Sequence, residues 1–260
     1  MSGTVQYKTD EEIGFIRESS LLVGKTLAEV ARHIAPGVTT RALDKVAETF
    51  IRDHGAIPGF LGYGGFPATL CISVNEQVVH GIPGDRVLMD GDLVSVDCGV
   101  LMNGFYGDSA FSFAVGEVSE EVRLLLDRTR ESLELGIAAA QEGGRIGDIG
   151  HAIQSYVEGF GYTVVRELIG HGLGRNLHEK PDVPNYGRSG SGLRLKEGLV
   201  ICIEPMVNLG SRTVVQEKDG WTIRTLDRKP SAHFEHAVAV TSGQAEVLST
   251  FEFIDEVLKS

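Results

Sequence analysis

The spacing of apolar residues predicts two amphipathic helices at the start of the chain. Between residues 16 and 34, apolar or small side chains recur at steps of three and four, as they do along one face of an α-helix. Thr9 and Glu12 have the spacing of a capping box, and Pro36 follows the pattern, so we expect a helix that begins after Thr9 and ends before Pro36. A second helix is expected over about residues 40–54, which also carry an apolar face.

Shorter apolar runs predict strands in the middle and at the end of the chain. Asn103-Gly104 is a hairpin signal between two of these runs, and Ser119 is expected to cap a further helix. We expect helices over about residues 119–142 and 147–158, and strands near 69–74, 93–100, 104–115, 162–168, 199–204, 213–217, 221–225 and 233–240.

The order of helices followed by strands occurs twice, which indicates an internal repeat. The apolar face of the second expected helix maps onto residues 143–161 when 106 is added to each number. Residues 90–97 align with residues 197–204 at a shift of 107, and an acidic residue ends both segments. We therefore expect one domain over residues 1–260, made of two related halves at about 10–115 and 119–250.

Composition and charge exclude several classes of protein. Lys and Arg number 24 against 36 Asp and Glu, a net charge of −12 that disfavours non-specific binding to nucleic acid or anionic lipid. Apolar runs such as residues 199–203 are far shorter than the roughly 20 residues of a membrane-spanning helix. The first residues lack a secretion signal, and Cys71, Cys98 and Cys202 form no CxxC pair, so we expect a cytoplasmic protein without disulfides.

Four acidic residues in apolar surroundings are the first candidates for chemistry. Asp97 and Asp108 flank the expected hairpin, and a turn with an even number of residues would place them on one sheet face. If the halves are related by a pseudo-two-fold axis, Glu204 is the counterpart of Asp97 and Glu235 that of Asp108. Buried carboxylates repel one another unless a cation neutralises them, so the cluster indicates a two-metal site.

Glycines flank His171 in the sequence Gly-His-Gly-Leu-Gly at residues 170–174, which favours close approach of the backbone to a ligand and makes His171 the expected nitrogen donor. His178-Glu179 follows shortly afterwards, and His80 lies in Val-His-Gly-Ile-Pro at residues 79–83. Together with the four acids, these motifs resemble the methionine aminopeptidases of type I, and the resemblance extends over nearly the whole chain. It implies the α+β, duplicated pita-bread fold, with an antiparallel sheet covered by helices on its outer face.

The resemblance also implies a dinuclear centre and the role of each ligand. Asp97 would chelate one divalent ion, Asp108 and Glu235 would bridge both, and His171 with Glu204 would complete the other. Oxygen-rich ligation with one imidazole suits Co, Mn, Fe(II) or Zn, and the sequence does not select among them.

Three residues would act directly in catalysis by the same resemblance. Glu204 would shuttle a proton, His178 would donate a hydrogen bond to the developing oxyanion, and His80 would contact the amide nitrogen beside the scissile bond. An apolar and aromatic pocket would take the methionine side chain. Residues that match this pocket are Phe60, Tyr63, Phe66, Cys71, Leu177 and Trp221, together with His80 and His178.

The sequence departs from the family at three positions that bear on pocket shape. Phe60 and Leu177 stand where bacterial relatives have cysteine and phenylalanine, and His233 stands where glutamine is expected. His233 would therefore add an imidazole near the metals.

The expected function is the metal-dependent removal of the N-terminal, initiator methionine when the second residue is small. Its partners would be N-terminal Met peptides and nascent chains, and a transient contact with the ribosome is compatible with this function. We expect no specific nucleic-acid partner and no membrane partner. The alternatives are a proline-specific peptidase of the same fold or a non-catalytic scaffold. Only about 90 residues precede Asp97, which disfavours the larger proline-specific enzymes, and the presence of all five ligand types disfavours a scaffold.

Overall fold

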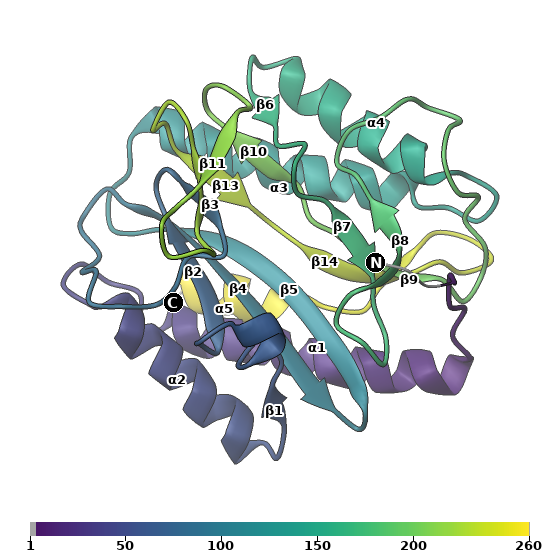
Figure 1. Cartoon of the computed structure of the whole chain (residues 1–260), viewed down its shortest axis with the longest axis horizontal. Coiled ribbons are helices and arrows are strands. Elements are labelled where there is room, and N and C mark those ends of the chain that lie inside the picture. The colour runs from purple at the N-terminus through teal and green to yellow at the C-terminus, as the bar shows by residue number, and fades with distance from the viewer. Residues whose placement is uncertain (1–3, 260) are drawn as a thin grey trace.

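The computed structural model describes residues 4–259, and Figure 1 shows its helices on the outside with the strands between them. The helices are α1 (Asp10–Ala31), α2 (Thr40–Asp53), α3 (Glu120–Ala139), α4 (Ile146–Glu158) and α5 (Glu252–Leu258), with a 3-10 turn η1 (Tyr63–Gly65). The longer strands are β2 (Leu70–Val74), β4 (Leu93–Met102), β5 (Phe105–Ala114), β8 (Glu179–Val183), β9 (Val200–Ile203) and β14 (His236–Ala239). The short strands are β1 (Ile57–Pro58), β3 (Gln77–Val79), β6 (Thr163–Val164), β7 (Gly170–Gly172), β10 (Met206–Asn208), β11 (Val214–Gln216), β12 (Ile223–Thr225), β13 (Ser231–His233) and β15 (Glu246–Val247).

Every strand pair in these sheets is antiparallel. One sheet has the order β1-β4-β2 with β5 paired to β4, and another has the order β15-β14-β9-β7-β8. Two smaller sheets, β13-β10-β6 and β11-β12-β3, complete the set. Helix α1 packs on β4 and β5, while α3 packs against β9, β10 and β13, so each large sheet has its own helical cover (Figure 1).

The start of α1 follows the pattern expected from the sequence. The Thr9 hydroxyl accepts a hydrogen bond from the Glu12 amide, and the Glu12 carboxylate accepts one from the Thr9 amide, which completes the predicted capping box. Ile16, Val23 and Leu27 are fully buried on the inner face of the helix. Each such side chain contributes about 1.5–3 kcal/mol to folding by leaving water, and this burial fixes α1 on the sheet.

The β4–β5 hairpin places its two acidic residues where the sequence predicts them. Gly99 pairs with Asp108 and Asp97 pairs with Ala110, so the two carboxylates are diagonal neighbours on one face. In the other large sheet Ile203 pairs with His236, which brings Glu204 and Glu235 together just beyond the ends of β9 and β14. Both large sheets therefore present two acids toward the same region.

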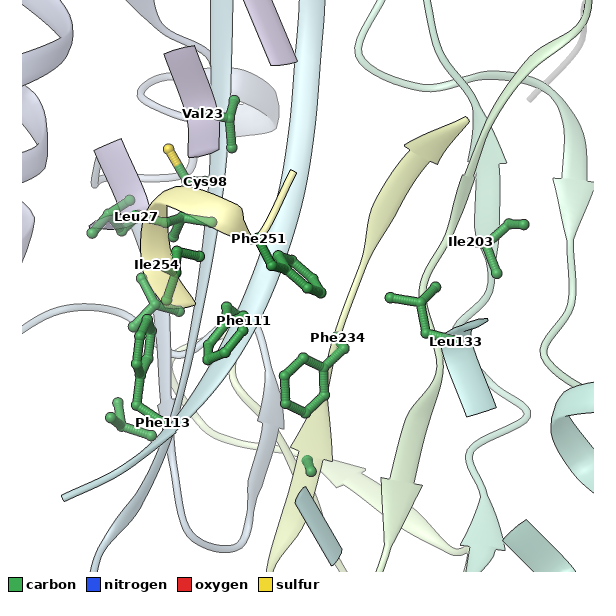
Figure 2. Close-up of a cluster of buried hydrophobic side chains, with 14 of the residues drawn as sticks. Val23, Leu27, Cys98, Phe111, Phe113, Leu133, Ile203, Phe234, Phe251 and Ile254 are labelled. Atoms are coloured by element: carbon green, nitrogen blue, oxygen red, sulfur yellow. The ribbon is translucent and has the colours of Figure 1, made fainter. Parts of the chain in front are cut away.

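An aromatic cluster packs β5 against the segments that carry Phe234 and Phe251 (Figure 2). Phe111 of β5 packs edge-on against Phe234, with ring centroids 5.0 Å apart, and against Phe251, with centroids 4.9 Å apart. All three rings are buried, and such pairs add roughly 0.5–1.5 kcal/mol beyond the area that they bury. Because Phe234 immediately precedes Glu235, the cluster also restrains that carboxylate.

Some elements differ from those expected. The strand predicted at 233–240 is wrong as a continuous element, because β13 ends at His233, β14 begins at His236, and Glu235 lies in the interruption. The strand predicted at 162–168 is reduced to β6. Strands β7 and β8 and helix α5 had no prediction. None of the helices within residues 4–259 is both long and apolar enough to cross a membrane.

Candidate active site

One cavity of about 330 Å³ opens between the two halves, and it gathers every site residue predicted from the sequence. Acidic and imidazole groups lie on part of its wall and apolar rings on the rest. The predicted residues that line it are Phe60, Tyr63, Phe66, Cys71, His80, Asp97, Asp108, His171, Leu177, His178, Glu204, Trp221 and Glu235. The structure therefore brings together positions that are up to 175 residues apart in the chain.

Asp108 and Glu235 are buried, Asp97 and Glu204 are partly buried, and several oxygens of these carboxylates lack partners. Among residues 4–259, Asp97 Oδ1, Asp108 Oδ1 and Glu235 Oε1 have no hydrogen-bond partner although they are inaccessible to solvent. Asp108 and Glu235 are 3% and 2% exposed. An unpaired buried carboxylate oxygen costs free energy, so this cluster requires protons or a cation.

Burial also changes the acidity of these groups in the protein without metal. Loss of hydration raises the pKa of Asp97 to about 7 and raises the pKa of Glu204 well above its ordinary value. The pKa of Asp108 and that of Glu235 are raised first by burial and then by the negative charges of the neighbouring acids. Each group thus favours protonation unless positive charge is supplied.

His171 points the lone pair of its Nε2 into the space between these acids. Its Nδ1 lies 2.9 Å from the carbonyl oxygen of Gly172, and because a carbonyl oxygen only accepts, Nδ1 carries the proton. Nε2 is therefore the free acceptor, 3.8 Å from Asp108 Oδ2 and 3.7 Å from Glu204 Oε1. Burial, more than the nearby His178, lowers the pKa of His171 to about 3, so the imidazole is neutral.

A divalent cation fits this donor set. Mn, Fe(II), Co and Zn accept ligands of this kind, namely a neutral imidazole nitrogen and carboxylate oxygens. The ligand atoms of Asp108, His171, Cys202 and Glu235 all lie within 4.8 Å of one another. The same oxygens that lack hydrogen-bond partners would then have a metal partner.

His178 lies beside this cluster, at the end of the loop that follows β7. Its ring meets that of His171 edge-on, with centroids 4.2 Å apart, and its Nδ1 is hydrogen-bonded to the Tyr63 hydroxyl at 2.8 Å. Burial, followed by the influence of His80, lowers the pKa of His178 to about 4. A neutral imidazole held by Tyr63 can present its other nitrogen to a ligand in the cavity.

His80 occupies an unusual backbone conformation at the other side of the cavity. Its φ is +58°, in the left-handed region that a non-glycine residue adopts only at some cost. The next residue, Gly81, packs so closely on β2 that an added Cβ would collide with the Ile72 carbonyl oxygen, and its amide donates a hydrogen bond to Ser73 Oγ. The strand therefore holds His80 in a fixed place, and burial lowers its pKa.

Apolar side chains form the remaining wall of the cavity. Phe60, Phe66 and Leu177 are buried, and the Trp221 ring packs edge-on against Phe66 with centroids 5.1 Å apart. Tyr63, 41% exposed, lies at the mouth. A narrow apolar chamber beside a polar cluster is suited to an unbranched apolar side chain.

Several residues that shape the site were missed by the sequence analysis as site residues. Cys202 belongs to the acid and imidazole cluster, and its position two residues before Glu204 in the strand predicted at 199–204 was an available signal, since alternate residues of a strand share a face. Asn185 Nδ2 donates to the Glu204 carbonyl at 2.9 Å, and Ser109 Oγ donates to the Glu235 carbonyl at 2.6 Å. These two contacts join segments that are distant in sequence, and no local sequence pattern predicts them.

His233, the predicted extra imidazole, does lie near the acids. Its Nε2 is buried, 3.8 Å from Glu204 Oε2, and has no hydrogen-bond partner among residues 4–259. Burial, followed by the influence of His80, lowers its pKa to about 3, so the ring is neutral.

Comparison with known proteins identifies the family. Residues 14–242 match the model of metallopeptidase family M24. The chain belongs to this family. It is 50% identical to methionine aminopeptidase 1 of Bacillus subtilis over 242 residues, which cover 93% of this chain and 98% of the relative. It is 49% identical to the methionine aminopeptidase of Clostridium acetobutylicum, over 94% of this chain and 98% of the relative.

Solved structures agree with this assignment and confirm the expected fold class. The crystal structure of methionine aminopeptidase from Rickettsia prowazekii superposes with a TM-score of 0.94 at 41% identity, over 95% of this chain and 100% of that one. Prolidase from Pyrococcus furiosus shares the fold alone, with a TM-score of 0.77 and 23% identity, and this chain spans 66% of its length. The M24 chain thus has the pita-bread fold and the resemblance to methionine aminopeptidases that its motifs indicated.

Proposed function

We propose that this M24 metallopeptidase releases the N-terminal methionine from peptides and nascent proteins whose second residue is small. The observation that carries the proposal is the convergence of four carboxylates, of which Asp108 and Glu235 are fully buried, and His171 at one side of an apolar cavity. Relatives that are about half identical over nearly their whole length are methionine aminopeptidases.

The five ligands predicted from the sequence would hold two divalent ions. Asp97 would chelate one ion, Asp108 and Glu235 would bridge both, and His171 and Glu204 would complete the second. The unpartnered oxygens of three of these carboxylates and the free Nε2 of His171 support this assignment. When bound, the ions would supply Lewis acidity and an activated water.

The chain's own residues would perform the proton transfers and the orientation of the substrate. Glu204, close to His171 and only slightly exposed, would accept a proton and return it to the leaving amine. His178, neutral and anchored on Tyr63, would donate a hydrogen bond to the oxygen of the scissile carbonyl as negative charge develops there. His80 would orient the amide nitrogen beside the scissile bond from its constrained backbone position.

The apolar wall would select methionine. A flexible thioether side chain fills irregular apolar space, and Phe60, Phe66, Cys71, Leu177 and Trp221 supply it here. With the terminal amine and the scissile carbonyl both held at the polar cluster, the second side chain of the substrate would face a wall that does not recede. A displacement of the carbonyl by about 1 Å can cost roughly 10²-fold in rate, so large second residues would be excluded.

The decisive experiment is to measure free methionine released from Met-Ser-Gly-Thr and Met-Lys-Gly-Thr by the metal-loaded protein. We expect rapid release from the first peptide and little from the second, with loss of activity on chelation and recovery when Mn or Co is added back. Comparable cleavage of both peptides would contradict the proposed specificity. Hydrolysis of a proline-containing dipeptide in their place would favour the proline-specific alternative.

We also propose that the enzyme acts in the cytoplasm, where chains begin with methionine, and that contact with the ribosome is transient. Support for this location is indirect: the three cysteines are buried as free thiols, as in proteins of reducing compartments. Retention of the protein in ribosome pellets at physiological salt would show a stable complex and contradict the transient contact.

A further inference from the structure

Lys8 ties the segment before α1 to the hairpin that carries two active-site histidines. Its Nζ lies 2.5 Å from Glu179 Oε2, and the two side chains are only 6% and 7% exposed. Its backbone amide donates a hydrogen bond of 2.6 Å to the Gly198 carbonyl oxygen, and Tyr7 forms a β-bridge with Leu199. Burying both charges is expensive, so the ion pair requires this close geometry.

The other carboxylate oxygen of Glu179 holds the loop of residues 173–178. Glu179 Oε1 accepts hydrogen bonds from the Asn176 amide at 3.1 Å and from Asn176 Nδ2 at 3.5 Å. Glu179 also begins β8 and pairs with Gly172 of β7, directly after His171. Glu179 therefore connects Lys8 and the loop through its carboxylate, and the strand of the nitrogen ligand through its backbone.

Two glycines leave the space that Lys8 occupies. A Cβ on Gly174 would lie 2.6 Å from Lys8 Nζ and 2.9 Å from Glu179 Oε1, and a Cβ on Gly198 would lie 2.7 Å from the Lys8 carbonyl oxygen. All three distances are shorter than real Cβ contacts, and the contact at Gly198 is with backbone. Gly174, the third glycine of the Gly-His-Gly-Leu-Gly motif, lies against the end of the lysine side chain.

His178 and Glu179 are adjacent in the chain, at the boundary between two hollows. His178 lines both the active-site cavity and the neighbouring hollow, and Glu179 lines that neighbouring hollow together with Lys8 and Asn176. A displacement of the Glu179 backbone would be passed on to His178, because one peptide unit joins them. We propose that Lys8 is a positioning residue, whose ion pair with Glu179 fixes the 173–178 loop and so holds His178 at the substrate carbonyl. This inference rests on the proposed function.

The test compares Lys8→Met in the wild-type and His178→Ala backgrounds. Methionine keeps the length of the lysine side chain but removes the amino group. We expect kcat for Met-Ser-Gly-Thr to fall about 10- to 100-fold, with KM changed less than about threefold and metal content unchanged, since a misplaced group mainly slows the chemical step. In the His178→Ala background the same substitution should lower kcat less than about twofold, because the two residues act as one unit.

Arg130→Met is the matched control. It removes a partly buried ion pair, Arg130 with Asp255 at 2.7 Å, that joins α3 to α5 away from the 173–178 loop. We expect a lower melting temperature with kcat retained. If Lys8→Met does not fold, Glu179→Gln decides the question: it keeps an oxygen for Lys8 but removes the charge, and it should lower kcat about threefold or more.

Several outcomes would overturn the inference. The first is a kcat within twofold of the wild type in Lys8→Met or, if that variant does not fold, in Glu179→Gln. The second is an equal loss of kcat when Lys8→Met is introduced in the His178→Ala background. The third is a similar loss of kcat in Arg130→Met. Failure of the metal-loaded wild-type protein to release methionine would instead overturn the proposed function, and this inference with it.

Discussion

The two pairs of carboxylates that face each other across the cavity are carried by different kinds of backbone. Asp97 and Asp108 lie inside strands of 10 residues each, which pair without interruption. Glu204 and Glu235 lie just outside the pairing of β9 and β14, which have 4 residues each. A continuous ladder satisfies its own backbone groups, whereas an interrupted one needs partners from elsewhere.

Those partners are side chains from distant segments. The Glu204 carbonyl accepts a hydrogen bond from Asn185, and the Glu235 carbonyl accepts one from Ser109 of β5. The Glu235 amide in turn donates to the Ala110 carbonyl oxygen. The first pair of acids is thus placed by local pairing and the second by contacts with residues outside β9 and β14, which makes the second pair more dependent on its surroundings.

The largest expected effect comes from removing one acid of either pair. Asp97→Ala in the regular hairpin and Glu235→Ala at the interrupted one should each lower kcat/KM roughly 10³-fold or more, because a metal ligand is lost. The measurement is methionine release at limiting metal, with metal content by elemental analysis. Full activity in either variant would contradict the dinuclear assignment.

A smaller effect is expected from His178→Ala. This residue lies beside the metal ligands but is assigned to the substrate carbonyl, so kcat should fall about 10²- to 10³-fold while bound metal is retained. Steady-state kinetics and elemental analysis of the same preparation check both parts. Loss of metal from the variant would place His178 among the ligands instead.

The interrupted pair should be sensitive to its distant partners. Ser109→Ala removes the donor to the Glu235 carbonyl and should weaken metal binding by about 10-fold, the lower end of effects at groups that orient ligands. Ser132→Ala is the control, because it removes a buried hydrogen bond to a carbonyl oxygen within α3. Equal metal affinity in the two variants, by titration calorimetry, would show that β5 does not orient Glu235.

The smallest expected effect is a change of stability with pH. Burial raises the pKa of Asp97 to about 7 and that of Glu204 well above its ordinary value, so above about pH 4 these carboxyl groups bind more protons in the folded, metal-free chain than in the unfolded chain. The lowered pKa values of His171, His178 and His233 act in the opposite direction below about pH 6.5, where these imidazoles take up protons only on unfolding. Stability of the metal-free protein should therefore fall as the pH rises from about 6.5 to about 7.5. Bound metal needs ionised carboxylates, so the stabilisation by metal should grow over that range.

Melting temperatures with chelator and with Mn at each pH measure this difference. Each kcal/mol corresponds to about 2–4 °C for a chain of this size. A constant difference across the range would mean that the carboxylates are ionised in the metal-free fold.

Much of the site could be predicted because its residues lie in strong local patterns. Asp97 and Asp108 flank a hairpin with a recognisable turn, and Glu204 ends an apolar run, so their faces followed from alternation alone. The roles of His80 and His178 came from resemblance and remain a proposal. The limits of the two halves, 10–115 and 119–250, also remain a prediction.

Short elements escaped prediction for a physical reason. Strand β7 is a Gly-His-Gly segment of three residues, too short and too poor in side chains to show any periodicity. The break at Glu235 was missed because Phe234 and Ala237 continue the apolar pattern through it. In both places the backbone is held by pairing with other segments, which a local window of sequence does not contain.

By itself, the sequence determined the long helices, the paired hairpin and the set of acidic and imidazole residues, because caps, turns and periodic burial act between neighbours in the chain. Only the tertiary structure decided that Lys8 reaches Glu179, that Ser109 and Asn185 hold the backbone of Glu235 and Glu204, and that Cys202 joins the cluster. These contacts join residues 19 to 171 positions apart or strands brought together by packing. They form only when burial of the core brings these segments together.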